Sequence, residues 1–144
     1  MNLYKVHSGS QGDVINDVFI RRKAEIGMVD EDPGKSHHRL RDEMHVVESR
    51  RDVELRRRED RHLIIIKPEL EECFLRSMKR VDLDTKLPKR AGDLQSVLNL
   101  PNQPKHKVFQ AELAQLYRTS REKNVPTFVT ELADFLRMLL QRHE

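Results

Sequence analysis

The feature that most constrains the fold of this 144-residue chain is a short run near its middle, His62-Leu63-Ile64-Ile65-Ile66-Lys67. Successive isoleucines favour an extended backbone, because β-branched side chains fit a pleated sheet. Side chains of a strand alternate between two faces, so an uninterrupted apolar run is covered on both. We therefore predict that residues 62–67 form a central strand of a sheet that carries helices.

The segments around this strand predict an α/β fold, with a small central sheet of about four to five strands and a helical C-terminal half. Patterns typical of strands occupy residues 3–6, 25–30, 44–48 and 53–56, and residues 14–23 carry a helical stripe. Pro68 suits the first turn of a helix, and the apolar spacing that follows predicts a helix over residues 70–81.

The organisation that we expect is a single domain over residues 1–144, with an α/β core at 1–81 and a helical extension at 82–144. The extension carries apolar stripes around residues 94–98, 108–117 and 128–139, and Thr127 is a suitable cap for the last helix. Residues 34–42 are polar and basic, and we expect a disordered loop there.

The strongest functional pattern is the acidic end of the strand at 25–30, in the stretch Ile26-Gly27-Met28-Val29-Asp30-Glu31-Asp32-Pro33-Gly34. On an extended backbone Asp30 and Asp32 point to the same side. Two carboxylates on one side suit a hard divalent cation such as Mg²⁺ or Mn²⁺. The alternative is an acidic turn that only caps the helix or loop that follows it.

Further side chains are candidates to complete such a site. Glu69 and Glu71 follow the central strand, where open α/β sheets place their ligands, although acids in a first helical turn also complement the helix dipole. His7 follows the first predicted strand, and a histidine beside the aspartates would move a proton or bind a transition metal.

Arginines crowd into residues 39–61, and among them Arg39, Arg41, Arg57 and Arg58 are candidates for nucleic-acid binding. Arginine makes bidentate contacts with phosphate, so a basic surface beside a metal site favours phosphodiesters. Acidic residues are interleaved with these arginines, and a solvated hairpin with mixed ion pairs is the alternative interpretation.

Other classes of function lack support in the sequence. Cys73 is the only cysteine, which excludes disulfide frameworks and multi-cysteine zinc sites within one chain. The longest apolar run is far too short to span a membrane, and the first residues do not resemble a secretory leader, so we expect a cytoplasmic protein without a membrane partner. Nucleophile-elbow, phosphate-loop and dinucleotide motifs do not occur.

A strand and turn, then a helix, then an apolar strand that ends in Asp30-Glu31-Asp32 resemble the Toprim domain of topoisomerases, primases and overcoming-lysogenization-defect nucleases, over about residues 1 to 75. The resemblance implies that Asp30 and Asp32 form the Asp-x-Asp motif that binds Mg²⁺ for phosphoryl transfer. The family also has a Glu at the end of its first strand, where this chain has His7 or Ser8. Some relatives act beside an ATPase, so the resemblance also suggests an ATPase partner protein.

Two functional hypotheses follow. The first is a Mg²⁺- or Mn²⁺-dependent, nuclease-like protein that processes nucleic-acid phosphodiesters, with the metal on Asp30 and Asp32. The second is a degenerate, non-catalytic Toprim-like domain that binds a partner protein or a second copy of itself. The retained acidic pair favours the first and the missing Glu favours the second. The broad apolar stripe at 128–140 suggests a homodimer or a partner, unless the rest of the chain covers it.

Overall fold

The computed structural model describes residues 14–20, 25–32, 39–100 and 104–141. The elements in this part, in chain order, are η2 (Asn16–Ile20, a π-helical segment), β1 (Ile26–Asp30), α2 (Arg39–Glu43), β2 (His45–Ser49), β3 (Val53–Arg58), β4 (Arg61–Ile66), α3 (Leu70–Arg80), α4 (Ala91–Leu98), α5 (Pro104–Lys123) and α6 (Phe128–Gln141). The prediction of an α/β fold with a small sheet and a helical C-terminal half is confirmed.

The four described strands form one mixed sheet in the order β1-β4-β3-β2. β1 runs parallel to β4, and Asp30 at its end pairs with Ile66. β3 is antiparallel to both β4 and β2. The predicted central strand is therefore β4, which lies between β1 and β3.

The sheet has a separate apolar layer on each face, as the uninterrupted run in β4 predicts. Ile64 and Ile66 join the larger core with side chains from α3, α4, α5 and α6. Leu63 and Ile65 point to the other face, where they meet the η2 region. All four side chains are at most 2% exposed, so the strand is buried on both faces.

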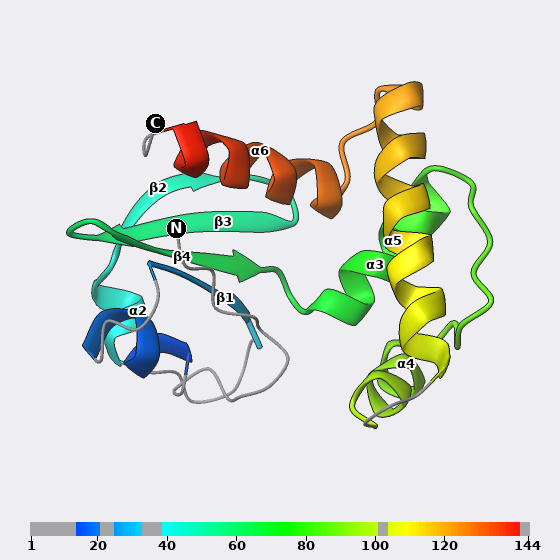
Figure 1. Cartoon of the computed structure of the whole chain (residues 1–144), viewed down its shortest axis with the longest axis horizontal. Coiled ribbons are helices and arrows are strands. Elements are labelled where there is room, and N and C mark those ends of the chain that lie inside the picture. Colours follow the sequence, from blue (N-terminus) through cyan, green and yellow to red (C-terminus); the bar gives the residue numbers. More distant parts are fainter. Residues whose placement is uncertain (1–13, 21–24, 33–38, 101–103, 142–144) are drawn as a thin grey trace.

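The helices are distributed over two places (Figure 1). α6 lies along one face of the sheet, over β2 and β3, whereas α3, α4 and α5 pack together beyond the end to which β4 points. Because α6 packs on the sheet, the helical extension and the α/β core share one apolar core. The C-terminal ends of β1 and β4 face the three packed helices.

Some local expectations differ from the structure. Residues 39–43 form the short helix α2, so the disordered loop predicted for 34–42 is wrong in that part, and residues 33–38 lie outside the described residues. The strand predicted at 3–6 and the loop residue His7 also lie outside them. Thr127 precedes α6 as predicted, but its amide donates to Thr130 Oγ1 (2.9 Å), and its hydroxyl contacts Ser120.

Candidate functional site

The acidic segment after β1 lies at the edge of the sheet that faces the helical half. Parallel strands bring their C-terminal ends to the same edge, so the end of β1 meets the end of β4. The amide of Glu31 donates to the Ile66 carbonyl at 2.8 Å, and the amide of Asp32 donates to the Pro68 carbonyl at 3.1 Å. These two bonds hold the acidic segment against the residues that lead into α3.

Asp30 caps α3 from a distant part of the chain. Its Oδ1 accepts a hydrogen bond of 2.9 Å from the amide of Leu70, the first residue of the helix. Glu69 occupies the N-cap position but makes no side-chain cap. A carboxylate at this place satisfies one of the free amides of the first turn and complements the helix dipole. Asp30 therefore has a capping role, but the helix it caps is α3 and not an element that directly follows the acidic turn.

Asp32 departs from the strand geometry that the sequence analysis assumed. β1 ends at Asp30, and Asp32 has a φ of 47°, in the left-handed region. The alternation of side chains along a strand therefore does not reach Asp32, so it does not place the Asp32 side chain on the same side as that of Asp30. Its charge is nevertheless close enough to raise the pKa of both Asp30 and Glu71.

Glu71, in the first turn of α3, is the most unusual carboxylate of this region. Its residue is 7% exposed, and its Oε2 is buried and makes no hydrogen bond within the described part of the chain. Burial is the main cause that raises its pKa, and the charges of Glu69 and Asp32 add to the effect. A buried carboxylate oxygen without a donor is costly, because it has lost its hydration without compensation.

The four acidic side chains interact as one electrostatic group, which we call the carboxylate cluster (Asp30, Asp32, Glu69 and Glu71). Burial raises the pKa of Asp30 to about 7, and the charge of Glu71 is the next largest cause. Asp32 and Glu69 contribute in the same direction, while the Leu70 amide opposes them. Burial is the largest cause of the raised pKa of both Asp30 and Glu71, and repulsion among the like charges adds to it.

The chemistry of the cluster suits a hard cation. Its donors are all carboxylate oxygens, which Mg²⁺ and Mn²⁺ prefer. Within the described ranges, no group of three or more His, Cys, Asp and Glu side chains is arranged to hold a metal. Magnesium sites commonly use only one or two carboxylates together with water and substrate oxygens. Two carboxylates therefore suffice, and in this cluster Glu71 Oε2 is a buried oxygen without a hydrogen-bond partner among the described residues.

Of the predicted phosphate-binding arginines whose side chains the structure describes, Arg41 lies close enough to the cluster to interact with Asp32, whereas Arg57 and Arg58 lie elsewhere. Arg41 is buried, and its Nη1 donates to the Glu31 carbonyl at 2.8 Å, so it holds the acidic segment in place. Arg57 and Arg58 lie at the far end of β3, where Arg58 pairs with Arg61. Asp30 pairs with Ile66, at the opposite end of β4. His7 and the side chain of Arg39 lie outside the description.

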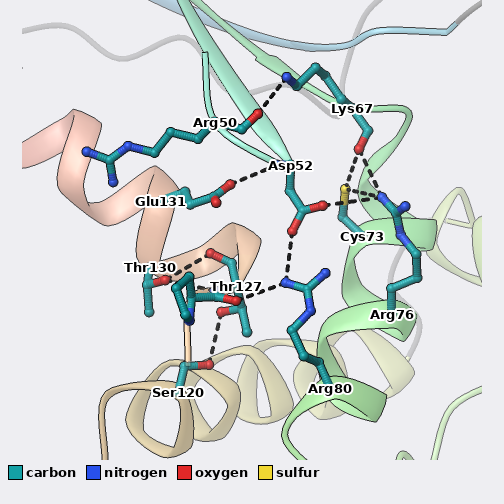
Figure 2. A network of polar contacts seen from close by, with 11 residues as sticks. Arg50, Asp52, Lys67, Cys73, Arg76, Arg80, Ser120, Thr127, Thr130 and Glu131 are labelled. Carbon is teal, nitrogen blue, oxygen red and sulfur yellow. Dashed lines mark hydrogen bonds and ion pairs between the residues drawn. The ribbon is translucent and has the colours of Figure 1, made fainter. Parts of the chain in front are cut away.

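A second polar centre, which the sequence analysis missed, surrounds Asp52 at the same edge of the sheet (Figure 2). The Asp52 carboxylate is 1% exposed and pairs with Arg80 at 3.2 Å and with Arg76 at 3.4 Å. Its amide donates to Glu131 Oε1 of α6 at 2.9 Å. Asp52 therefore joins the sheet to α3 and α6.

This Asp52 network is a structural clamp, because its charges are paired. Arg80 also donates to the Pro126 carbonyl, and the Cys73 thiol donates to the Lys67 carbonyl at 3.0 Å. Burial raises the pKa of Cys73 to about 12, so the thiolate that reacts as a nucleophile does not form at neutral pH. By contrast, Glu71 Oε2 of the carboxylate cluster has no hydrogen-bond donor within the described part of the chain.

The sequence contains no local signal for the Asp52 network. Asp52 belongs to a predicted turn, and its partners follow 24, 28 and 79 residues later. By contrast, Glu71 was a candidate because it follows the carboxyl end of a strand, where open α/β sheets place their ligands.

None of the helices in the described ranges combines the length and the apolar character that a membrane crossing requires. Comparison of the chain with protein-family models, curated proteins and solved structures returned no match.

Proposed function

We propose that this chain is a Mg²⁺- or Mn²⁺-dependent, nuclease-like protein of Toprim-like type that processes nucleic-acid phosphodiesters. The observation that carries the proposal is the buried Glu71 Oε2, which lies beside the other acids of the carboxylate cluster and has no hydrogen-bond donor among the residues that the structure describes. A divalent cation there would replace the missing donor and relieve the repulsion that raises the pKa of Asp30.

The ion would be held by Glu71 Oε2 and Asp30 Oδ2. The other Asp30 oxygen, Oδ1, accepts the hydrogen bond from the Leu70 amide. Asp32 and Glu69 add negative charge, which increases the local concentration of cations. A bound Mg²⁺ or Mn²⁺ supplies positive charge to the oxygens of a phosphodiester. The contribution of the chain is to fix these carboxylates at the end of β1 and the start of α3.

Metal binding is tested first, by the thermal unfolding of metal-free protein with increasing Mn²⁺. An ion that binds only the folded state at ten times its Kd adds about 1.4 kcal/mol of stability. For a chain of this size that raises the melting temperature by several degrees. Glu71→Gln keeps the shape of the side chain and removes its charge, and we expect it to abolish the shift.

Glu72→Gln is the matched control, since Glu72 is the next residue of α3 but does not contribute to the raised pKa of Asp30. It should retain the Mn²⁺ shift. A wild-type melting temperature that is unchanged at millimolar Mn²⁺ contradicts the proposal at its first step.

Cleavage is tested separately, with a labelled oligonucleotide and with EDTA as the metal-free control. We expect Mn²⁺-dependent cleavage that Glu71→Gln abolishes and Glu72→Gln retains. A protein that binds Mn²⁺ through Glu71 but cleaves neither DNA nor RNA belongs to the non-catalytic alternative.

A further inference from the structure

A cavity of about 330 Å³ lies between α3 and the connection from α3 to α4, in the helical half of the molecule. Its apolar lining comes from Leu75 and Met78 on α3 and from Leu83 on the connection. This volume falls in the range of small-molecule sites, which are typically apolar with a few charged or polar groups.

The wall of the cavity that the connection forms is fixed by hydrogen bonds. The amide of Leu83 donates to the Met78 carbonyl at 2.8 Å. The Thr85 hydroxyl donates to Glu112 Oε1, and the amide of Lys86 donates to Glu112 Oε2 at 3.2 Å. Glu112 is buried on α5, so the connection is tied to a long helix. A ligand site built in this way is largely pre-formed.

The charges that line the cavity are mainly positive. Lys79 and Lys89 both line it, and within the described part of the chain neither ammonium group makes a hydrogen bond or an ion pair. Arg76 also lines it but is engaged with Asp52 and the Lys67 carbonyl. Asp84 is the one acid among the lining residues.

The segment of the sequence that forms the cavity and the helices after it is also basic. Residues 76–123 hold eleven Lys and Arg against five Asp and Glu, an excess larger than the net charge of +3 of the whole chain. The acidic carboxylate cluster lies at the N-terminal end of α3, so the two regions of opposite charge share one helix. A positive field of this kind attracts anionic ligands and increases their association rate.

We infer that this cavity binds the phosphate group of a nucleotide, with Lys79 and Lys89 on the phosphate and the apolar wall against the sugar or base. Two unpaired ammonium groups match a compact anion, and Leu75, Met78 and Leu83 match an apolar body carried by it. A free nucleotide and one unit of a nucleic-acid strand share this chemistry. The strand is the source expected here, which rests on the proposed function.

The test is the binding of a fluorescently labelled single-stranded oligonucleotide to the full chain in EDTA, followed by anisotropy over a range of salt concentrations. The Lys79→Ala/Lys89→Ala variant should weaken binding at least tenfold. It should also lower the slope of log Kd against log salt by about 0.7 for one lost phosphate contact.

The control is Lys105→Ala/Lys107→Ala, which removes the same charge from exposed positions of α5 outside the cavity. It should change Kd less than threefold. The inference is overturned if both variants lose the same affinity for the oligonucleotide, or if the cavity variant loses none. Either result would indicate diffuse electrostatic attraction instead of a site. Thermal melts of both variants verify that they are folded.

Competition separates the sources of the phosphate. An unlabelled oligonucleotide that competes far better than a nucleoside monophosphate supports the strand, and equal competition per molecule supports a free nucleotide in the same cavity. Displacement by a poly-glutamate peptide as efficient as by the oligonucleotide overturns the nucleotide assignment. Binding is measured in EDTA and therefore without the metal. If Glu71→Gln binds the oligonucleotide but no longer cleaves it with Mn²⁺, the proposed function is tested separately from this cavity.

Discussion

At the scale of single residues, Asp30 combines two roles that oppose each other. As an acceptor it caps α3 through the Leu70 amide, and as a charge it lies in a partly buried acidic group. Asp30 was a candidate in the sequence because Glu31 and Asp32 follow it directly in the chain. The capping contact was not predictable, since it joins positions 40 residues apart.

The raised pKa of Asp30 predicts how the stability of metal-free protein depends on pH. The folded-state pKa is about 7 and the ordinary value is 3.8, so between these values the folded state binds more protons than the unfolded state. The free energy of unfolding therefore falls as the pH rises from about 4 to about 7. Asp30→Asn should flatten this fall and be more stable than wild type above pH 7, measured by urea unfolding in EDTA. A variant with the wild-type pH profile contradicts the assignment.

Asp30→Ala separates the cap from the charge. At pH 4 to 5 the wild-type side chain is mainly protonated and still accepts from Leu70, so charge repulsion is small. Loss of the acceptor should then cost about 0.5–2 kcal/mol of unfolding free energy. Asp30→Asn, which keeps an acceptor oxygen, serves as the control and should cost less at that pH.

Asp52 belongs to the same scale, as a buried charge with two arginine partners. Asp52→Ala leaves the Arg80 guanidinium, whose side chain is 18% exposed, without its carboxylate, and should cost about 3–5 kcal/mol in urea unfolding. Arg76→Ala should cost at most about 1 kcal/mol, because the Arg76 side chain is 46% exposed. Similar costs for both changes would show that Asp52 is not the centre of the clamp.

At the scale of elements, the sequence predicts those helices and strands that depend on a local pattern of apolar residues. The apolar run of β4 specified a central strand, and its four core side chains are buried as expected. Ile65→Ala should cost about 2–5 kcal/mol, the range for a buried isoleucine truncated to alanine. Fast amide exchange at residues 63–66 would contradict a central position for this strand.

The packing of η2 on β1 is a tertiary feature that periodicity does not show. A Cβ added to Gly27 would lie 2.9 Å from methyl groups of both Val14 and Val18. Gly27→Ala should therefore cost about 1–3 kcal/mol through overpacking. Adding Val18→Ala should recover part of this loss in the same urea unfolding assay, whereas two independent, additive losses would contradict the close contact.

At the scale of the whole molecule, the C-terminal helix returns to the sheet and joins the larger of the two apolar cores. Phe128, Phe135 and Leu139 of α6 are buried, and Leu132 and Leu136 are partly buried against the same core. This return was not predictable, because an apolar stripe does not specify its partner. The chain itself covers most of the stripe that suggested a dimer.

Leu140 is the part of that stripe that stays outside, at 51% exposed, while Met138 packs partly against the core. A single exposed leucine is common on monomeric proteins, so we expect a monomer. Light scattering across a concentration series measures this directly. If the protein is a dimer and Leu140→Asp dissociates it, the result would favour the alternative function of a homo-oligomerisation module.

The central claim is that the carboxylate cluster at the end of β1 and the start of α3 binds a divalent cation. The most direct measurement is an anomalous difference map from crystals grown with Mn²⁺. We predict a manganese peak within about 2.5 Å of carboxylate oxygens of both Asp30 and Glu71, the contact distance of hard cations. A map without a peak at the cluster, with Glu71 Oε2 bonded to a protein donor, would contradict the claim.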